Sequence, residues 1–479
     1  MAWIFSIIFV SMSVASPIIS LHQPVEIAPS AVNLSWSYNG KNASVRFEVW
    51  RTLQSSELSD DWMVLGWTHS HTWQSVGMLG GSSHRHKICV EYTQNCSAVV
   101  NSDIPPWSTK HSGKVLLAAS QAFPRIGEGT IIRWNNELLL FLSRQSVQKD
   151  VGASNITLLR STDNGTTWSD PVVVPPDSAI PSRANPGAAM LPNDDIVLTY
   201  FVGSGHTSAV RVYRHSSDGG HTWGPEHLLT DGSAPYMTGA HDRLRQLSNG
   251  RLVQVLHARQ NGTHQLGTLA FTSDDAGHTW TARGSGNGST LSVPLSASRL
   301  PHSMGIKCNE FGFWEAAVAE VTSSPDDGRL LMVGRTCTGW LYQSTSTDWG
   351  GVWSDPVPVG GVERVREGGI RHPLAPPNIV RVTDKDREVL VLVYSSHFNP
   401  HEGWELGVRE VLGLQISRDG GVSWGSYRHV EGVGVADEHV SYCSLYADQV
   451  TRTLHLTYRS GSTFGISTRY LQIPFQDIL

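Results

Sequence analysis

The chain has 479 residues, which is more than one ordinary domain, and a formal net charge of −6 from 36 Lys and Arg against 42 Asp and Glu. This balance excludes a typical nucleic-acid-binding protein, which carries a basic surplus. The 46 Gly, 24 Pro and 17 Trp favour an all-β fold rich in turns. Hydrophobic residues make up 39% of the chain, enough for a large core, which excludes a disordered protein.

Residues 1–16 form an apolar segment of signal-peptide length that ends in small residues, with cleavage expected near Ala15. The alternative is an N-terminal membrane anchor, because the start of the segment lacks Lys and Arg. No other stretch of the sequence is long and apolar enough to span a bilayer. We therefore expect a secreted or lysosomal protein, without a transmembrane segment once the signal is removed.

Glycosylation sites and cysteines agree with export. Seven N-x-S/T sequons are present, at Asn33, Asn42, Asn95, Asn155, Asn164, Asn261 and Asn287. Five cysteines fit an extracytoplasmic protein with few disulfides. We expect Cys89 to pair with Cys96 across a small loop and Cys308 to pair with Cys337, which leaves Cys443 as a free thiol.

Residues 20–104 consist of short alternating segments such as VNLSW from Val32 and KICVEY from Lys87, which predict β-strands. The expected buried Trp36 and the late Tyr92 resemble a fibronectin-III-like β-sandwich. A Pro- and Ser-rich stretch follows, so we place a linker at 105–115.

From residue 116 onward, internal repeats dominate the sequence. The box S-x-D-x-G-x-x-W occurs five times, and its tryptophans are 55, 57, 73 and 71 residues apart, at Trp168, Trp223, Trp280, Trp353 and Trp424. The box Asp can accept backbone N–H groups in a hairpin turn, and the Gly permits positive φ. Units of this length fit four short strands, the size of a propeller blade. Five boxes and a final segment without a box predict a six-bladed β-propeller over 116–479.

Several charged residues outside the boxes interrupt apolar strands or end them, where a propeller lines its central pocket. They are Arg125, Arg144, Asp150, Asp242, Arg243, Glu315, Arg335 and Arg409, and Tyr442 lies in a similar segment. Each alone has a simpler explanation. An Arg at a strand end is usually a solvated rim residue, and a Tyr in a sheet usually belongs to the core. Asp150 can cap a turn.

Together, the boxes and these spacings resemble the sialidase superfamily over roughly residues 115–479. The pair Arg125-Ile126 is similar to the family's R-I-P motif, whose Arg binds the substrate carboxylate, although the following Pro is absent. Arg144 and Asp150, which follow Arg125 by 19 and 25 residues, match a second pocket Arg and the acid/base Asp.

The later part of the chain carries the rest of this resemblance. Glu315 and Arg335 are 20 residues apart, like the family's Glu and its next triad Arg. Arg409 precedes the final box as the third triad Arg does, and Ser441-Tyr442 matches the segment of the nucleophilic Tyr.

Two segments depart toward a bacterial-type, sialidase-like branch, namely FPRIGEG and GAHDR. The resemblance therefore adds Glu128, Asp242 and Arg243 to the substrate-binding candidates, as residues that shape the pocket for a variant substrate.

The resemblance implies an exo-α-sialidase, a glycoside hydrolase that removes terminal sialic acids from glycoproteins or glycolipids with retention of configuration. Three arginines would bind the sialic-acid carboxylate, and a neutral Tyr442 would avoid the repulsion that a carboxylate nucleophile meets there. Glu315 would take the Tyr442 proton, and Asp150 would protonate the leaving oxygen.

We expect neither a cofactor nor a metal site. The alternatives are an inactive, lectin-like propeller that binds sialic acid, and a related glycosidase for another acidic sugar. Linkage preference and oligomeric state have no signal in the sequence.

Overall fold

A computed structural model describes residues 18–479, except for 29, 41–43, 54–61, 77, 79–81, 105–112, 149–151, 181, 206–207, 231–235, 260–265, 287–289, 294–311, 323–326, 361–368, 385–386, 398–408, 433–438 and 463–464. The expected signal peptide, Asp150, Cys308 and the sequons at Asn42, Asn261 and Asn287 lie outside the described residues. Within the described part the chain is all-β, as predicted, and its one helical segment is the 3₁₀ turn η2 (Phe475–Asp477). In that same part, no helix is long and apolar enough to cross a membrane.

The N-terminal strands form two antiparallel sheets, which agrees with the expected sandwich. One sheet holds β1 (Ile19–Leu21), β2 (Val25–Ala28), β3 (Ala31–Tyr38) and β6 (Thr72–Ser75). The other has the order β5-β4-β7-β8, with β4 (Phe47–Leu53), β5 (Met63–Thr68), β7 (Ser83–Val90) and β8 (Val100–Asp103). Trp36 is buried, and its ring meets that of Phe47 edge-on. The likeness to a fibronectin III domain stays a prediction.

The disulfide expectations are largely met. Cys89 and Cys96 are bridged, and Cys443 is a free, buried cysteine. Cys337 is disulfide-bonded. Its expected partner Cys308 is outside the described residues.

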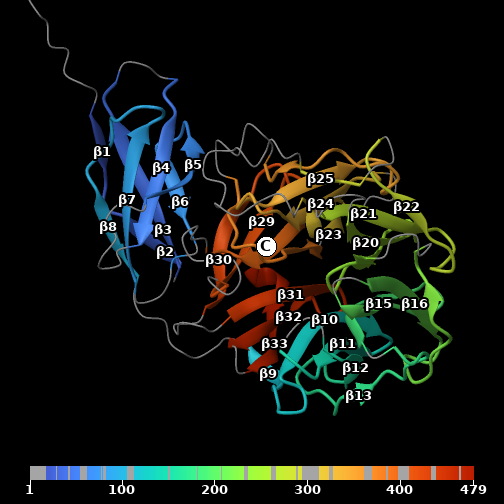
Figure 1. Cartoon of the computed structure of the whole chain (residues 1–479). Helices are drawn as coiled ribbons and strands as arrows, with labels where there is room; N and C mark the ends of the chain where they lie inside the picture. The colour runs from blue at the N-terminus through green and yellow to red at the C-terminus, as the bar shows by residue number, and fades with distance from the viewer. Residues whose placement is uncertain are drawn as a thin grey trace, which may run out of the picture.

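The remaining strands form runs of antiparallel neighbours around a central axis (Figure 1), which we name blades 1–6 in chain order. Single parallel pairings, Arg125 with Ile466 and Ser154 with Ser182, join blades 6, 1 and 2 into one continuous sheet. Blade 1 has β10 (Arg125–Trp134), β11 (Glu137–Gln145), β12 (Ser154–Ser161) and β13 (Val172–Val173), and blade 2 has β14 (Ser182–Met190), β15 (Ile196–Gly205), β16 (Ser208–Ser216) and β17 (His227–Leu228). Blade 3 has β18 (Met237–Thr238), β19 (Leu244–Gln246), β20 (Leu252–Arg259), β21 (Leu266–Ser273) and β22 (Thr281–Arg283).

The second half of the ring repeats this pattern. Blade 4 has β23 (Trp314–Glu320), β24 (Leu330–Arg335), β25 (Tyr342–Ser346) and β26 (Val357–Pro358), and blade 5 has β27 (Asn378–Asp384), β28 (Arg387–Ser395), β29 (Val411–Ser417) and β30 (Gly425–Gly432). Blade 6 has β31 (His439–Asp448), β32 (Thr453–Ser462) and β33 (Gly465–Pro474), and its fourth strand is β9 (Lys114–Leu117), which pairs with β33. The propeller therefore closes by joining a strand from its start to its last blade, and β9 begins inside the segment expected to be the linker.

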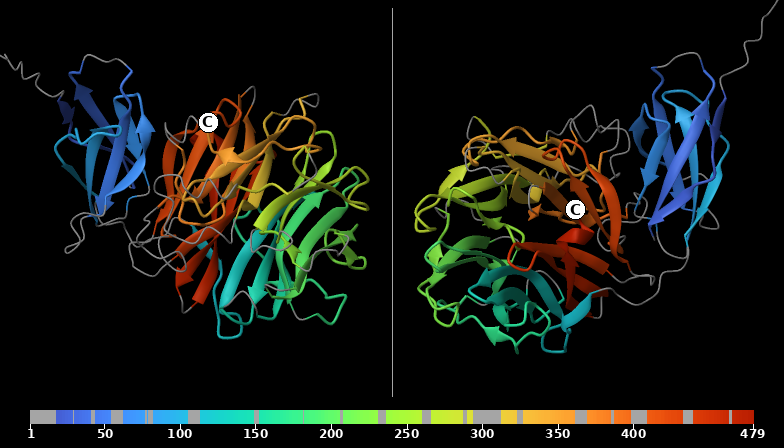
Figure 2. Two further views of the ribbon diagram at one scale, coloured as in Figure 1. Left: turned by 45° about the horizontal axis from the view of Figure 1, so that its top comes forward. Right: turned by 180° about the vertical axis from the view of Figure 1, so that it is seen from behind.

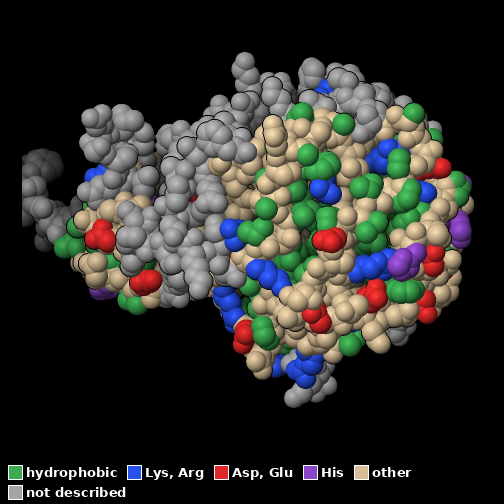
Figure 3. All heavy atoms as spheres, turned by 90° about the horizontal axis from the view of Figure 1, so that it is seen from below, with side chains coloured by type: hydrophobic (Ala, Val, Ile, Leu, Met, Phe, Trp, Pro, Cys, Tyr) green, Lys and Arg blue, Asp and Glu red, His purple; other side chains and the backbone are tan. Residues whose placement is uncertain are grey.

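The sandwich lies beside the propeller (Figure 2) and touches blade 5 and the segment before it. The Ser30 hydroxyl lies 2.9 Å from the Tyr427 phenol oxygen on β30, and Arg371 donates to the Val64 carbonyl at 2.8 Å. On the face seen from below, acidic and basic side chains are interspersed (Figure 3).

The box Asp residues fix hairpin turns, as expected. In the first box, Asp163 accepts from the Thr167 N–H at 2.8 Å and from the Ser161 hydroxyl at 2.8 Å. The same bonds recur at Asp218, Asp275, Asp348 and Asp419. These carboxylates serve the turns, so they are not site candidates.

Each blade has a non-glycine residue with positive φ within its innermost strand or in the segment that leads into that strand. These residues are Glu128, Asn185, Asp242, Glu315, Leu374 and Tyr442, with φ between 48° and 58°. At four of them the strand register shifts, as in a β-bulge, which re-aims the side chain. Because the blades repeat one strand order, their innermost strands run in the same direction along the axis. We therefore expect these residues to lie toward one end of the axis.

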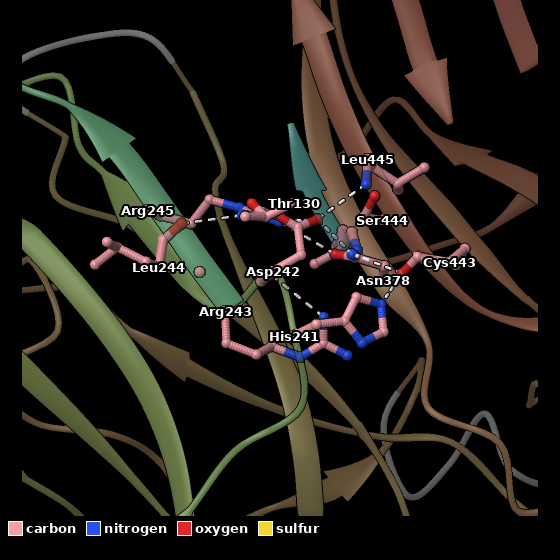
Figure 4. A network of polar contacts seen from close by, with 12 residues as sticks. Thr130, His241, Asp242, Arg243, Leu244, Arg245, Asn378, Cys443, Ser444 and Leu445 are labelled. Carbon is pink, nitrogen blue, oxygen red and sulfur yellow. Dashed lines mark hydrogen bonds and ion pairs between the residues drawn. The ribbon is translucent and has the colours of Figure 1, made fainter. Parts of the chain in front are cut away.

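A buried carboxylate connects four blades at the axis (Figure 4). Asp242 is 2% exposed and accepts from the Thr130 hydroxyl at 3.0 Å, from both Arg245 Nη atoms at 2.9 and 3.2 Å, and from the Asn378 amide at 2.8 Å and the Leu445 N–H at 2.9 Å. We call Thr130, Asp242, Arg245, Asn378 and Leu445 the axial network. Burial opposes ionisation, yet Arg245 and the other donors hold the pKa of Asp242 below its ordinary value.

The axial network predicts a large stability effect. Asp242→Ala leaves the Arg245 charge and several buried donors without their acceptor. We therefore expect the free energy of unfolding to fall by about 3–5 kcal/mol. Urea denaturation measures this loss. Asp274, which pairs with Arg251 and is 63% exposed, supplies the control, because Asp274→Ala should change stability little. Equal losses in the two variants would contradict a special role for the axial network.

Candidate active site

One pocket lies where the positive-φ residues gather. Four of them line it, namely Glu128, Asn185, Glu315 and Tyr442. Its other lining residues include Arg125, Gln145, Tyr236, Thr238 and His257. Sequence-predicted residues from blades 1, 4 and 6, far apart in the chain, therefore share one cavity.

The blade 1 wall is an arginine pair held by one carboxylate. Glu128 is 6% exposed, and its Oε1 accepts from Arg125 Nη2 at 2.8 Å and from Arg459 Nη1 at 2.7 Å. Burial disfavours the charge, but Arg125 and Arg459 lower the pKa of Glu128 to about 2. Glu128 is therefore ionised at neutral pH and fixes the Arg125 guanidinium at the pocket.

A second pair of arginines converges beside Glu315, although neither Arg335 nor Arg409 is among the residues that line the pocket. Arg335 Nη1 and Arg409 Nη2 donate to the same carbonyl, that of Leu374, at 2.5 and 2.9 Å. Arg335 Nη2 also lies 2.5 Å from Glu315 Oε2. The shared carbonyl acceptor keeps two like charges side by side, an arrangement suited to an anionic ligand.

Tyr442 lines the pocket and has cationic and aromatic neighbours. The Arg459 Cζ atom is 3.7 Å from the Tyr442 ring centroid, and the Arg409 Cζ atom is 5.6 Å from it. The His241 ring stacks on Tyr442 at 5.9 Å. Burial lowers the pKa of Arg409, and the nearby Tyr442 and Glu315 oppose this effect. Two arginines and the His241 ring therefore surround the Tyr442 side chain at the pocket.

Arg144 and Asp150 are not placed in this cavity. Arg144 is outside the residues that line the pocket, and its Cζ atom lies 3.9 Å from the Phe123 ring centroid. Burial lowers the pKa of Arg144. Asp150 is outside the described residues, so its expected role stays a prediction.

Asp242 and Arg243 require a correction. Both are almost fully buried, at 2% and 1% exposure, and neither lines the pocket. Asp242 is occupied by the axial network. Arg243 donates through Nη2 to the carbonyls of Glu315 at 3.1 Å and Pro377 at 2.8 Å. We therefore revise their expected role from substrate contact to support of the axis and of the Glu315 backbone.

Several polar residues of the site were missed from the sequence. Gln145 Oε1, Asn185 Oδ1, Thr238 Oγ1 and His257 Nδ1 are buried, line the pocket as side chains, and find no hydrogen-bond partner among the described residues. Buried polar atoms normally have partners, so these four residues are candidates for polar contacts at the site. The sequence holds one signal for Asn185, which is a polar residue directly before Pro186. Arg459 has no such signal, because it resembles a polar position of an ordinary strand.

A comparison with protein families identifies the chain. The model described as a BNR repeat-like domain matches residues 172–456, more than half of the sequence. The chain belongs to the BNR repeat-like family. No curated protein matches it in a sequence search.

Solved structures show that this BNR repeat-like protein has the sialidase fold. A Hadza microbial sialidase superposes with a TM-score of 0.58 at 14% identity, covering 96% of each chain. A leech intramolecular trans-sialidase, complexed with 2,7-anhydro-Neu5Ac, gives 0.58 at 11% identity over 96% of this chain and 98% of its own. Trypanosoma rangeli sialidase gives 0.56 at 15% identity over 77% of this chain and 60% of its own.

The pKa of Glu128 predicts a pH-dependent stability difference. Its folded-state value of about 2 lies below the ordinary 4.5, so its contribution to stability is complete above about pH 4.5 and is lost as the pH falls toward 2. Glu128→Gln should therefore destabilise the protein by roughly 3 kcal/mol at neutral pH, and the gap should narrow in acid. Urea denaturation of both proteins at several pH values measures the gap. A gap that stays constant with pH would show that the charge of Glu128 is not what stabilises this wall.

Proposed function

We propose that this protein is a secreted exo-α-sialidase that releases terminal sialic acids from glycoconjugates with retention of configuration. The observation that carries the proposal is the convergence of Arg335 and Arg409 on one acceptor, beside Glu315 and Tyr442. A site for a neutral sugar would not need two adjacent arginines. The sialidase names of the structural neighbours support the same substrate class.

In this proposal the arginines bind the substrate carboxylate. Arg335 and Arg409 contact it from blades 4 and 5, and Arg125 contacts it from blade 1, where Glu128 holds its guanidinium. A planar guanidinium pairs with a carboxylate in a bidentate way that lysine does not reproduce. Charge and geometry together orient the anomeric carbon, to which a sialic-acid carboxylate is attached.

Tyr442 is the proposed nucleophile. Its phenol oxygen attacks the anomeric carbon while its proton passes to Glu315, and the glycosidic C–O bond breaks. A neutral phenol approaches the carboxylate-bearing carbon without the repulsion that an anionic nucleophile meets. Water then attacks the anomeric carbon from the face opposite Tyr442, the bond to Tyr442 breaks, and Glu315 returns the proton to the phenol. Two inversions of configuration give net retention.

Asp150 is the proposed acid/base residue. It protonates the leaving oxygen in the first step and activates water in the second. Asp150 follows Arg125 by 25 residues, which resembles the spacing of the family's acid/base Asp and supports this role. The role of Arg144 as a second arginine at the substrate rests on the same resemblance alone.

Secretion is part of the proposal. Four predicted sequons fall in described segments, at Asn33, Asn95, Asn155 and Asn164, and none of these asparagines is buried. The Cys89–Cys96 disulfide also fits an oxidising compartment. Glycosidase digestion of the secreted protein, followed by peptide mapping, tests this part.

The purified protein should hydrolyse a fluorogenic aryl sialoside. Tyr442→Phe should remove most of that turnover, because the nucleophilic oxygen is lost. The variant should keep the fold, because only one oxygen is removed. A mechanism-based fluorosialoside should label Tyr442, as read by mass spectrometry. Binding of sialic acid without turnover would favour the lectin-like alternative, and turnover of another acidic sugar alone would favour the related glycosidase. Labelling at a different residue would contradict the assignment of Tyr442. Because one neighbour is an intramolecular trans-sialidase, the product should be identified as free or anhydro sugar.

The role of Asp150 predicts a dependence on the leaving group. Asp150→Ala should slow hydrolysis of a sialyl-lactose-type substrate by about 10²–10⁴-fold, since a sugar alcohol needs a proton to leave. An activated aryl sialoside, whose leaving group is already acidic, should be affected much less. Steady-state kinetics on both substrates give the ratio, with Tyr442→Phe as the control that harms both. Equal losses on the two substrates in Asp150→Ala would argue against a proton donor at this position.

A further inference from the structure

Arg459, on β32, contacts the candidate nucleophile and has no role in the mechanism described above. Its Cζ atom lies 3.7 Å from the Tyr442 ring centroid, closer than that of Arg409 at 5.6 Å. Arg459 is 7% exposed and is not among the residues that line the pocket. Its guanidinium lies over the face of the tyrosine ring.

The strand pairing explains how the contact arises. Ser441 of β31 pairs with Arg459 of β32, and the register shifts between Ser441 and Ser444. Tyr442 sits in that irregularity with a φ of 55°. A bulge redirects the side chain that it contains, and here it brings the Tyr442 ring over the neighbouring Arg459.

Two adjacent residues of β10 hold Arg459 in place. Glu128 accepts from Arg459 Nη1 at 2.7 Å. At Gly127 a Cβ atom would lie 2.4 Å from Arg459 Cγ and 2.9 Å from Cδ, so a side chain there would displace the arginine stem. Glu128 thus fixes the Arg459 guanidinium, and Gly127 leaves room for the Arg459 methylene groups.

The charge of Arg459 persists at neutral pH. Burial and the nearby Arg125 lower the pKa of Arg459 to about 10, while Glu128 and Tyr442 act in the opposite direction. A cation over an aromatic face is attracted to the ring. The attraction increases when the phenol loses its proton, because the negative charge spreads into the ring.

We propose that Arg459 is a positioning residue that stabilises the anionic form of Tyr442 through the face of its ring. Its effect on catalysis rests on the proposed function. In the first displacement the Tyr442 oxygen bonds to the anomeric carbon, its proton goes to Glu315, and the protonated sugar alcohol leaves. In the second, water attacks, the bond between the anomeric carbon and the Tyr442 oxygen breaks, and the departing phenolate regains its proton from Glu315. Negative charge on the phenol oxygen develops in both steps, so Arg459 assists both.

A titration that does not depend on activity tests the contact directly. The ultraviolet absorbance of tyrosinate is followed with pH, and the signal of Tyr442 is isolated by subtracting the matching protein that carries Tyr442→Phe. In Arg459→Met the titration midpoint should rise by about 0.5–1.5 pH units, and Arg459→Lys should lie between Arg459→Met and the parent protein. Arg183→Met is the matched control, because Arg183 is 6% exposed and pairs with Glu226 at 2.8 Å in blade 2, away from Tyr442.

Kinetics give the second readout. Arg459→Met should lower kcat and the rate of Tyr442 labelling by about 3- to 30-fold. Its affinity for an unreactive sialic-acid glycal should stay within about twofold of the parent, because Arg459 is bound to Glu128 and packs on the Tyr442 ring. Gly127→Ala keeps every charge but moves the arginine stem, so it should change the titration and kcat in the same direction.

The outcomes separate this inference from the proposed function. An unchanged Tyr442 midpoint in folded Arg459→Met overturns the inference, whether or not the protein hydrolyses sialosides. A shifted midpoint in a protein without sialidase activity supports the ring contact and refutes the proposed function. If Arg459→Met does not fold, Arg459→Lys and Gly127→Ala decide the matter, and a parent-like midpoint in both overturns the inference.

Discussion

A single buried carboxylate at the axis is the interaction on which the ring depends. Six inner strands bring backbone and side-chain donors to a place with little water, where buried donors need acceptors. Asp242 accepts from blades 1, 3, 5 and 6, which is why a chain with local sheets holds together across its centre. Asp242 and Arg245 line a second cavity of about 340 Å³ that shares no lining residue with the pocket of Tyr442.

The same axis positions the candidate site. Positive φ at an ordinary side chain is uncommon and tends to occur where surrounding structure enforces it for function. Here it recurs in every blade within the innermost strand or the segment that leads into it, and the affected residues include Glu128, Glu315 and Tyr442. Arg243 links this site to the axial network, because it donates to the Glu315 carbonyl while its neighbour Asp242 connects the blades. Stability and site geometry are therefore coupled through two consecutive residues.

Much of this organisation is predictable from the sequence, because it repeats. The boxes predict the propeller, and the turn contacts of their Asp residues follow from local chemistry alone. Spacing also selects Arg125, Glu315, Arg335, Arg409 and Tyr442 as neighbours. Spacing does not indicate how deeply a side chain is buried, however. Asp242 and Arg243 were therefore expected to contact the ligand, although both side chains are almost fully buried. Closure by β9 depends on a partner strand more than 300 residues away. The contact of Arg459 with Tyr442 depends on a bulge. Neither feature leaves a local pattern in the sequence.

The central claim is that the converging arginines form a carboxylate-binding site. Calorimetric titration with a sialic-acid glycal and with its methyl ester tests it most directly, because the two ligands differ only in that charge. The site described here predicts that the acid binds at least about tenfold more tightly than the ester, a difference of about 1.4 kcal/mol, and that Arg335→Lys removes most of the advantage. Equal affinities for the acid and the ester, or an advantage that survives in Arg335→Lys, would contradict it.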